Sequence, residues 1–389
     1  MKNPLRTILA KYRDAILPRT GLAPLITKDS PIVVAGMFRT QNGIGRAAQG
    51  CYDALEKEGF KPIAVDLSEL FNQSESEPVV PIESMPRSAN GTLILFANPP
   101  ETKLSLLRLN MRRWGNWRII GAWTWELPTV PASWAAHFKH FSEIWVPSRF
   151  VADALQNMDG PKVRVVPHYV PVRETENFRT RLGSDDSELV QYLCMADGRS
   201  SFQRKNILAA VEMFQQAFMD DQNVRMVIKC RNLHLYPAIA SDLNDHIDGD
   251  DRIEVVSETL SPSQLNALIS ASHVLVSPHR SEGFGLGLAE AMAMGLPVIA
   301  TGWSGNLEFM SAQNSILLPY TLESVNDSTG VYENDGRSVW ASVNVNDGAN
   351  AMLQLKQNPS LRHELGKCAQ RDIARILNSR IYKEALHSV

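Results

Sequence analysis

Cysteine, net charge and long apolar runs are all scarce in this sequence. The 389-residue chain has four cysteines, Cys51, Cys194, Cys230 and Cys368, and no CxxC pair. This usage excludes a disulfide framework and a structural zinc site, and it is typical of a reduced cytosolic protein. No apolar run approaches the ~20 residues of a membrane span, and the N-terminus lacks the pattern of a secretory signal. We therefore expect a cytoplasmic protein.

A strong excess of one charge is also absent, since the formal net charge is −3. Nucleic-acid-binding proteins normally carry a strong basic excess, so we expect no nucleic-acid partner. Only residues 1–30 are locally basic, and "NPLRTILAKYRDAIL" sets apolar residues at helical spacing between the charges. This segment predicts either a helix packed on its own domain or a peripheral contact with anionic lipid on the inner face of the cytoplasmic membrane.

Short β-branched runs alternate with helical patterns along the chain. A first cycle predicts strands at 31–38, 61–67, 91–98, 118–125, 143–148 and 162–168. A second cycle predicts strands at 189–196, 224–230, 252–258, 273–278 and 297–301. Apolar strands that alternate with helices indicate parallel sheets covered on both faces. The sequence therefore predicts an α/β protein with two Rossmann-like, doubly wound domains.

The domain boundaries follow from composition. Residues 1–172 form the first predicted domain, the polar stretch 173–186 a linker, and residues 187–365 the second domain. We expect residues 366–389 to form a helix that crosses back to the first domain, and 323–338 to be a surface loop. Ligands of parallel α/β sheets bind at the carboxyl ends of the strands, so we expect the site in a cleft between the domains.

The stretch "SPHRSEGFGLGLAEAMAMG" follows the predicted strand 273–278 and opens a helix near Leu286. Free backbone N–H groups at such a helix start bind anions, and glycines allow close approach of a ligand. Glu282 and Glu290 would lie ~12 Å apart on a continuous helix. That separation suits a nucleotide sugar, with hydroxyls at each end and a diphosphate between them. The alternative is that Glu290 braces the helix while Glu282 is solvated.

Three further stretches carry candidate binding residues. "GRSSFQRKN" offers Arg199, Arg204 and Lys205 as cations for the diphosphate of such a ligand, although basic clusters are commonly solvated faces. "RTQNGIGRAAQG" offers the backbone at Gly43 and Gly45 to the phosphates, and the late third glycine excludes a dinucleotide GxGxxG. "AWTWELPTVPASW" offers Glu126 among tryptophans, a composition common in carbohydrate sites and also in cores.

A metal site is not expected. "DGDD" at 248–251 has a D-x-D spacing, in which two carboxylates could bind a divalent metal such as Mg²⁺ or Mn²⁺. It lies between a helix and the strand at 252, at the end away from the predicted site, so we interpret it as a surface turn. No His or Cys cluster has metal-ligand spacing, and no cofactor is predicted.

Taken together and in order, these motifs resemble the retaining glycosyltransferases of family 4 (group 1), which have the two-domain GT-B fold. "SEGFGLGLAEAMAMGLPVIAT" resembles the family's E-x7-E signature, and "DGRSSFQRKNILAAVEMFQQAF", "GWSGNLEFM", "AWTWELPTVPASW", "EIWVPSRF" and "GIGRAAQG" resemble its other conserved stretches. A histidine is common in this family where the present chain has Trp125–Glu126, which leaves any acceptor-side base open.

The resemblance implies roles for the donor-site residues. Glu290 would bind the donor's ribose, Glu282 would lie beside the transferred sugar, and Lys205 with either Arg199 or Arg204 would bind phosphate. The remaining donor contacts fall in three loops: Gly283, Phe284, Gly285 and Leu286; Ser304, Gly305 and Asn306; and Glu258 near the base. His279 lies near the same site by position.

The resemblance also implies a reaction. It predicts metal-independent transfer of a hexose, of mannose or glucose type, from a nucleoside diphosphate sugar to a glycan or lipid-linked glycan, in polysaccharide or lipopolysaccharide assembly. The first domain would bind the acceptor and the second the nucleotide sugar. Two alternatives keep the same fold: a catalytically silent module that binds nucleotide sugars, and a sugar-nucleotide epimerase.

Overall fold

The computed structural model describes residues 17, 30–110, 116–172, 189–332 and 336–387. Their contacts divide the chain into two compact units. Unit 1 comprises Met1–Trp125, Val130–Tyr169 and Ser379–Val389, and unit 2 comprises Glu126–Thr129 and Val170–Asn378. The predicted linker at 173–186 and the basic N-terminal segment lie outside the described residues. None of the described helices combines the length and apolarity needed to cross a bilayer.

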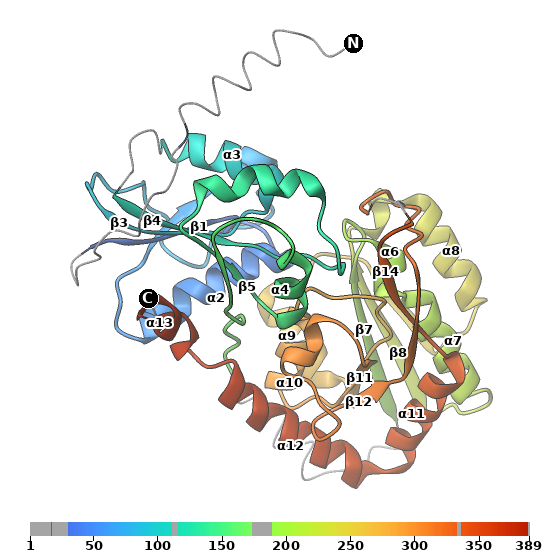
Figure 1. Cartoon of the computed structure of the whole chain (residues 1–389). Helices are drawn as coiled ribbons and strands as arrows, with labels where there is room; N and C mark the ends of the chain where they lie inside the picture. The colour runs from blue at the N-terminus through green and yellow to red at the C-terminus, as the bar shows by residue number, and fades with distance from the viewer. Residues whose placement is uncertain (1–16, 18–29, 111–115, 173–188, 333–335, 388–389) are drawn as a thin grey trace. The chain divides into compact units, whose positions relative to one another are not determined.

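Unit 1 is built on a parallel six-stranded sheet in the order β2-β1-β3-β4-β5-β6 (Figure 1). Its strands are β1 (Ile32–Gly36), β2 (Ile63–Asp66), β3 (Gly91–Leu95), β4 (Trp117–Ala122), β5 (Glu143–Val146) and β6 (Lys162–Val165). Its helical segments before the C-terminus are α2 (Gly43–Lys57), η1 (Glu69–Phe71), α3 (Pro99–Arg108), η2 (Ala132–His140) and α4 (Arg149–Leu155). Val33 of β1 joins one buried cluster and Val34 joins another, so both faces of the sheet are covered.

Unit 2 has the same architecture, with the parallel order β12-β11-β10-β7-β8-β9 (Figure 1). Its strands are β7 (Val190–Asp197), β8 (Val224–Arg231), β9 (Ile253–Val256), β10 (Val274–Ser277), β11 (Val298–Thr301) and β12 (Ile316–Leu318). Its helical segments are α6 (Phe202–Lys205), α7 (Ile207–Ala217), η3 (Leu233–Leu235), α8 (Pro237–Ile247), α9 (Pro262–Ala271), α10 (Leu286–Ala293), η4 (Gly305–Glu308), α11 (Val345–Gln357) and α12 (Pro359–Ile376). The predicted class, two doubly wound parallel-sheet domains, is confirmed.

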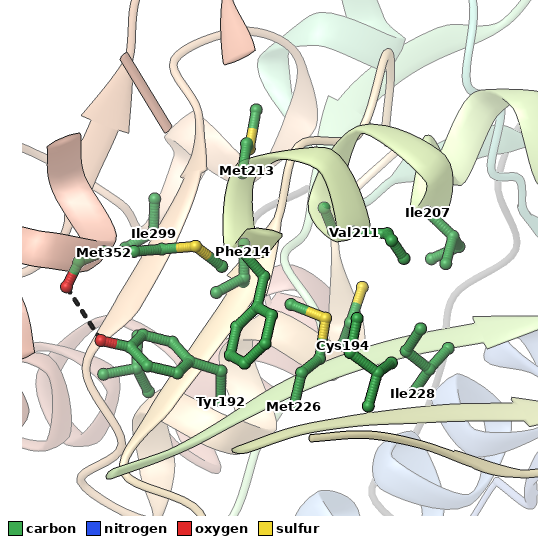
Figure 2. Close-up of a cluster of buried hydrophobic side chains, with 14 of the residues drawn as sticks. Tyr192, Cys194, Ile207, Val211, Met213, Phe214, Met226, Ile228, Ile299 and Met352 are labelled. Carbon is green, nitrogen blue, oxygen red and sulfur yellow. Dashed lines mark hydrogen bonds between the residues drawn. The ribbon is translucent and has the colours of Figure 1, made fainter. Parts of the chain in front are cut away.

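A buried hydrophobic cluster joins β7 to α7 and α11 in unit 2 (Figure 2). The rings of Tyr192 on β7 and Phe214 on α7 meet edge to face, with centroids 6.1 Å apart. The Tyr192 hydroxyl donates a hydrogen bond of 2.8 Å to the carbonyl oxygen of Met352 on α11 (Figure 2). Burying a phenol hydroxyl without a hydrogen-bond partner would cost free energy. This bond satisfies the hydroxyl, so the aromatic ring can fill the core.

An antiparallel hairpin interrupts the α/β pattern after β12. It consists of β13 (Tyr320–Ser324) and β14 (Val339–Val343). The described residues between these strands form no helix or strand and most are exposed, so the prediction of a surface loop at 323–338 holds for the described part of that range except Glu323 and Ser324, which belong to β13. Asp327 and Tyr332 lie between the two strands and are only 2% and 4% exposed. Asp327 accepts hydrogen bonds from Thr329 and from Ser201 before α6, and Ser328 accepts one from Gln203 on α6. Composition does not reveal these contacts.

The C-terminal helix α13 (Arg380–His387) belongs to unit 1, where it lies beside α2 (Figure 1). Tyr382 and Ala385 are buried in the cluster that contains α2. Arg118 Nη1 donates a 2.8 Å hydrogen bond to the carbonyl oxygen of Leu386, which closes the end of the helix. The predicted boundary at residue 366 falls inside α12, which continues to Ile376. The chain passes from unit 2 to unit 1 at Ser379.

Replacing Tyr382 by alanine should destabilise unit 1 strongly. The side chain is 2% exposed and its ring lies 6.1 Å from that of Trp145, so its removal leaves a cavity that costs about 3–5 kcal/mol. Urea unfolding followed by tryptophan fluorescence measures the change. The neighbouring Lys383→Ala is the control, because its ion pair with Glu58 is half-exposed and contributes about 0–1 kcal/mol. Equal losses for both variants would contradict the packing described.

Candidate functional site

The candidate site of unit 2 lies at the carboxyl ends of three neighbouring strands. The sheet order places β11, β10 and β7 side by side and parallel, so the loops that follow them meet at one edge. These loops are 302–304, 278–285 and 198–201, and they lead into η4, α10 and α6. The edge is where ligands of parallel α/β sheets bind.

The loop after β7 leads into α6, a single turn that carries both candidate cations. Ser201 is the N-cap, and its hydroxyl oxygen accepts a hydrogen bond of 3.2 Å from the backbone N–H of Arg204. Asn206 ends the turn in the left-handed conformation, at φ 54°. A side-chain cap at one end and a left-handed residue at the other fix a helix too short to be stable alone.

Arg204, Lys205 and Glu282 form an ion cluster at this edge of the sheet. Arg204 is its buried cation, at 4% exposure. Its Nη1 donates to the carbonyl oxygen of Ser281 at 2.7 Å and lies 3.1 Å from Glu282 Oε1, while Nη2 donates to Ser200 Oγ at 2.7 Å. Burial lowers the pKa of Arg204, and the nearby Tyr332, Glu282 and Glu126 outweigh that effect and raise it. The guanidinium is therefore always charged and joins the loop after β10 to α6.

Glu282 is the buried anion, at 7% exposure. Its Oε1 accepts a short hydrogen bond of 2.5 Å from Lys205 Nζ, and its backbone N–H donates to Ser304 Oγ at 2.9 Å. Burial raises the pKa of the carboxyl, but the charges of Lys205 and Arg204 outweigh burial and lower the pKa to about 2. One carboxylate is thus held between two cations, so Glu282 is not solvated as the alternative reading supposed.

This ion cluster predicts a specific loss of stability in acid. Because the folded-state pKa of Glu282 is about 2 against its usual 4.5, its stabilising effect is complete above about pH 4.5 and is lost as the pH falls toward 2. We expect the stability difference between the wild type and Glu282→Gln, measured by urea unfolding, to shrink steadily between pH 5 and about pH 3. A difference that does not vary with pH would show that Glu282 is not held ionised in this way.

His279 and Asn306 are buried and join the loop after β10 to the segment that follows β11 through hydrogen bonds. His279 is fully buried, its Nε2 lies 3.2 Å from Asn306 Oδ1, and Asn306 Nδ2 donates to the carbonyl oxygen of Thr301 at 3.0 Å. Burial lowers the pKa of His279, so the ring is neutral at pH 7. The hydrogen bonds connect the end of β10 to the end of β11. His279 and Asn306 are therefore in the site as positioning groups, with no exposed atom for a ligand.

Close backbone packing explains the glycines here. A Cβ on Gly305 would lie 2.1 Å from the carbonyl oxygen of Gly283, so these two loops meet without room for a side chain. Gly305 N–H donates to the carbonyl oxygen of Glu282 at 2.8 Å, and Gly285, the N-cap of α10, has φ 88°. Ser304 has φ 85° without being glycine, a strained conformation typical of functional loops.

Phe284, Leu286 and Glu290 have different surroundings. The Phe284 ring is buried against Phe309, with centroids 5.0 Å apart, so only its backbone could face a ligand. Leu286 is the first residue of α10, where backbone N–H groups lack helical partners. Glu290 lies about one turn further along the helix, where the sequence places it, and its side chain is half-buried. Its role at the ribose stays a prediction.

Glu126 contacts the loop after β10 and belongs with residues 127–129 to unit 2, although the chain on either side of that segment belongs to unit 1. Its carboxylate Oε2 accepts a hydrogen bond of 3.1 Å from the Tyr332 hydroxyl, and its carbonyl oxygen accepts one from Ser281 Oγ. Burial raises the pKa of Tyr332 well above its usual value, so the phenol stays a donor. Tyr332 and Ser281 are residues that sequence reasoning missed, and only the hairpin geometry brings Tyr332 here.

Arg199 and Glu258 lie near β8 and differ from Arg204 in exposure. Arg199 is exposed, and its backbone N–H donates to Asp197 Oδ1 at 3.1 Å. Glu258 is exposed too, and its carbonyl oxygen accepts a hydrogen bond of 2.8 Å from the buried Lys229. The structure thus brings Arg204 to Glu282, while Arg199 belongs to the loop beside Asp197.

In unit 1, Gly43 and Gly45 open α2 after β1. Gly43 is exposed, with open space around the position of a Cβ. Gly45 is buried, its N–H donates to the N-cap Asn42 at 2.9 Å, and a Cβ would lie 2.4 Å from the carbonyl oxygen of Met37. Gly45 is therefore explained by packing inside its own loop. A contact of Gly43 with a donor, and a cleft between the units, stay predictions.

The described residues contain no group of three or more His, Cys, Asp or Glu side chains arranged to hold a metal ion. The D-x-D stretch forms the turn after α8, where Asp248 and Gly249 are exposed and left-handed. Asp250 pairs with Arg252 at 2.6 Å, which closes this turn. Its interpretation as a surface turn is confirmed.

Comparison with known families matches residues 192–327 to the family model "Glycosyl transferases group 1". Comparison with curated protein sequences gives no match. The matched segment contains α6, Glu282 and the loop at 304–306, so it spans the ion cluster of unit 2. The match confirms the predicted enzyme class, a glycosyltransferase, for this part of the chain.

Solved glycosyltransferase structures share the fold. A glycosyltransferase from Rickettsia africae is 14% identical, with TM-score 0.63, over 93% of this chain and 100% of that one. HepE from Anabaena, solved with UDP and glucose, is 12% identical, with TM-score 0.63, over 92% and 100%. TarM from S. aureus, solved with UDP, is 16% identical, with TM-score 0.56, over 76% of this chain, which spans only 54% of TarM. These likenesses confirm the GT-B type of fold.

Proposed function

We propose that this protein is a retaining, metal-independent hexosyltransferase that uses a nucleoside diphosphate sugar. The observation that carries the proposal is the buried cluster of Glu282, Arg204 and Lys205 at the carboxyl ends of β7 and β10. Fixed cations at this edge suit the charge that develops on a departing diphosphate. A carboxylate between them suits sugar hydroxyls, because each oxygen accepts hydrogen bonds.

In the proposed reaction, the bond between the sugar's C1 and the leaving phosphate oxygen breaks. The acceptor oxygen forms a bond to C1 on the same face, and its proton passes to the departing β-phosphate. Lys205, which is 24% exposed, would turn from Glu282 to this phosphate, while the buried Arg204 would hold Glu282 in place and also keep its charge beside the phosphate. No protein base or metal ion takes part in this scheme.

The remaining roles follow the family resemblance and the loop geometry. Glu290 would bind the ribose hydroxyls, and the backbone at Gly283 and Gly285 would meet the sugar and phosphate. The UDP and glucose bound to HepE favour a glucose-type donor over a mannose type. The acceptor would be a glycan or lipid-linked glycan of polysaccharide or lipopolysaccharide assembly, which the cytoplasmic protein would reach at the membrane surface through its basic N-terminal segment.

Incubation with single nucleotide sugars and a glycan acceptor tests the proposal. We expect release of nucleoside diphosphate with one donor, and an NMR spectrum of the product with the anomeric configuration of the donor retained. Lys205→Ala should slow release by about 100-fold, whereas the exposed Lys367→Ala should not. Nucleotide binding without turnover would identify a silent module, an epimerised donor would identify an epimerase, and an inverted product would exclude retention.

A further inference from the structure

The turn at 327–332 is organised around one buried carboxylate. Asp327 accepts hydrogen bonds from the Thr329 hydroxyl at 2.6 Å and from the backbone N–H groups of Val331 and Tyr332 at 2.9 and 3.0 Å. Asp327 is 2% exposed. An aspartate that gathers several local donors fixes the shape of a turn, so the path of the chain to Tyr332 is set by this side chain.

The same carboxylate reaches α6. Asp327 Oδ1 accepts a hydrogen bond of 2.9 Å from Ser201 Oγ, and that hydroxyl oxygen accepts the backbone N–H of Arg204 at 3.2 Å. Ser201 is fully buried, so its hydroxyl uses both its donor and its acceptor capacity inside the protein. The chain of bonds therefore runs from Asp327 through the N-cap of α6 to the residue that holds Glu282.

At the other end of the turn, Tyr332 reaches Glu126. The buried phenol donates to Glu126 Oε2 at 3.1 Å, and Glu126 is also held through its carbonyl oxygen by Ser281. Thr129, three residues on, forms a 2.5 Å hydrogen bond with Ser338, just before β14. Segment 126–129 is thus attached to unit 2 by the loop after β10 and by the hairpin.

We propose that Asp327 and Tyr332 are positioning residues of the glycosyl-transfer site, Asp327 for the cation-bearing turn α6 and Tyr332 for the Glu126 carboxylate. This inference rests on the proposed function. The match to the glycosyltransferase family model ends at residue 327, so Tyr332 lies beyond the matched segment. The hairpin therefore adds to the site a contact that the matched motifs do not contain.

A double-mutant cycle tests Tyr332. We expect Tyr332→Phe to lower kcat about tenfold, with the KM for the donor within about twofold of the wild type, because Glu126, which would orient the acceptor hydroxyl without taking its proton, loses the hydrogen bond that positions it while α6 is untouched. In a Glu126→Ala background, where the acceptor of the Tyr332 hydroxyl is gone, the same change should cost less than about twofold. Tyr320→Phe, on the exposed strand β13, is the matched control. Equal losses in both backgrounds would overturn the role of Tyr332.

Hydrogen exchange and nucleotide binding test Asp327. We expect Asp327→Asn to speed amide exchange at residues 202–206 by at least about tenfold and to weaken UDP binding by about tenfold, while the exposed Asp220→Asn changes neither. Ser201→Ala should have the same effect, and the double variant should be no worse than either single one. Unchanged exchange in Asp327→Asn would overturn the inference.

The two proposals fail differently. If the wild type binds no nucleotide and turns over no nucleotide sugar, the proposed function is wrong, while the exchange experiment still decides whether Asp327 holds α6. If the wild type is an active transferase and both variants match it in kcat, KM and exchange, the positioning roles are wrong and the function stands. Thermal unfolding of each variant shows whether a loss of activity reflects loss of the fold instead.

Discussion

Replacing Arg204 by methionine is expected to reduce glycosyl transfer by at least about 100-fold, the scale of losing a preorganised charge beside a transition state. Arg204 is 4% exposed and contacts Ser200, Ser281 and Glu282. Breaking a buried ion pair costs about 3–5 kcal/mol, and we expect the lower end because Lys205 stays beside Glu282. Initial rates of diphosphate release and urea unfolding measure the two effects.

Arg199→Met is the matched control and decides between the two arginines of the predicted phosphate loop. Arg199 is exposed, so its replacement should change stability by less than about 0.5 kcal/mol and the rate by less than about threefold. If Arg199→Met lost activity while Arg204→Met kept it, the exposed arginine would be the phosphate ligand and the buried one only a brace.

Replacing Glu282 by glutamine should separate transfer from nucleotide binding. The amide keeps the shape of the side chain but no longer neutralises Arg204 and Lys205, which lie 3.1 and 2.5 Å from Oε1. We expect turnover to fall by about 100-fold or more and stability to fall by about 3–5 kcal/mol. The affinity for the nucleoside diphosphate alone should rise, by about tenfold, because two cations lose their competing carboxylate.

Isothermal titration with UDP and with GDP measures this rise, and Arg204→Met should shift the same affinity in the opposite direction. Glu254→Gln is the control, since its ion pair with Arg225 is half-exposed at 3.6 Å and contributes about 0–1 kcal/mol. A tenfold weaker affinity in Glu282→Gln would mean that this carboxylate orders the phosphate site instead of competing with it.

The parallel sheets follow from local sequence, which explains why their strands were predictable. A strand buried on both faces is apolar throughout, as in "PIVVAGMF" and "HVLVSP", and the glycine or polar residue at its end marks the following loop. The short β12 and the hairpin strands were not predicted. All five residues of β13 are exposed, so no periodic burial marks it in the sequence.

Sequence spacing also located Glu282, Lys205 and the loop at 304–306, because each follows a strand of the same parallel sheet. It did not separate Arg199 from Arg204, which differ by five positions in one basic loop. The difference arises from α6, whose single turn directs Arg204 inward to Ser281 and Glu282. The capping bond that shapes this turn depends on Asp327, more than 100 residues away.

By itself, the sequence determined the α/β class, the two sheets and the glycosyltransferase motifs, since strand burial and loop glycines are local properties that leave a pattern in the chain. The tertiary structure alone decided which charges meet: it buried Arg204 with Glu282, brought Glu126 to Tyr332 and fixed α6 through Asp327. Hydrogen bonds and ion pairs between residues far apart in the chain depend on their positions in space. The hydrophobic periodicity of the sequence therefore gives no sign of them. For that reason the motifs predicted the chemistry of the site, while the hydrogen bonds that join the loop between β13 and β14 to it were not predicted.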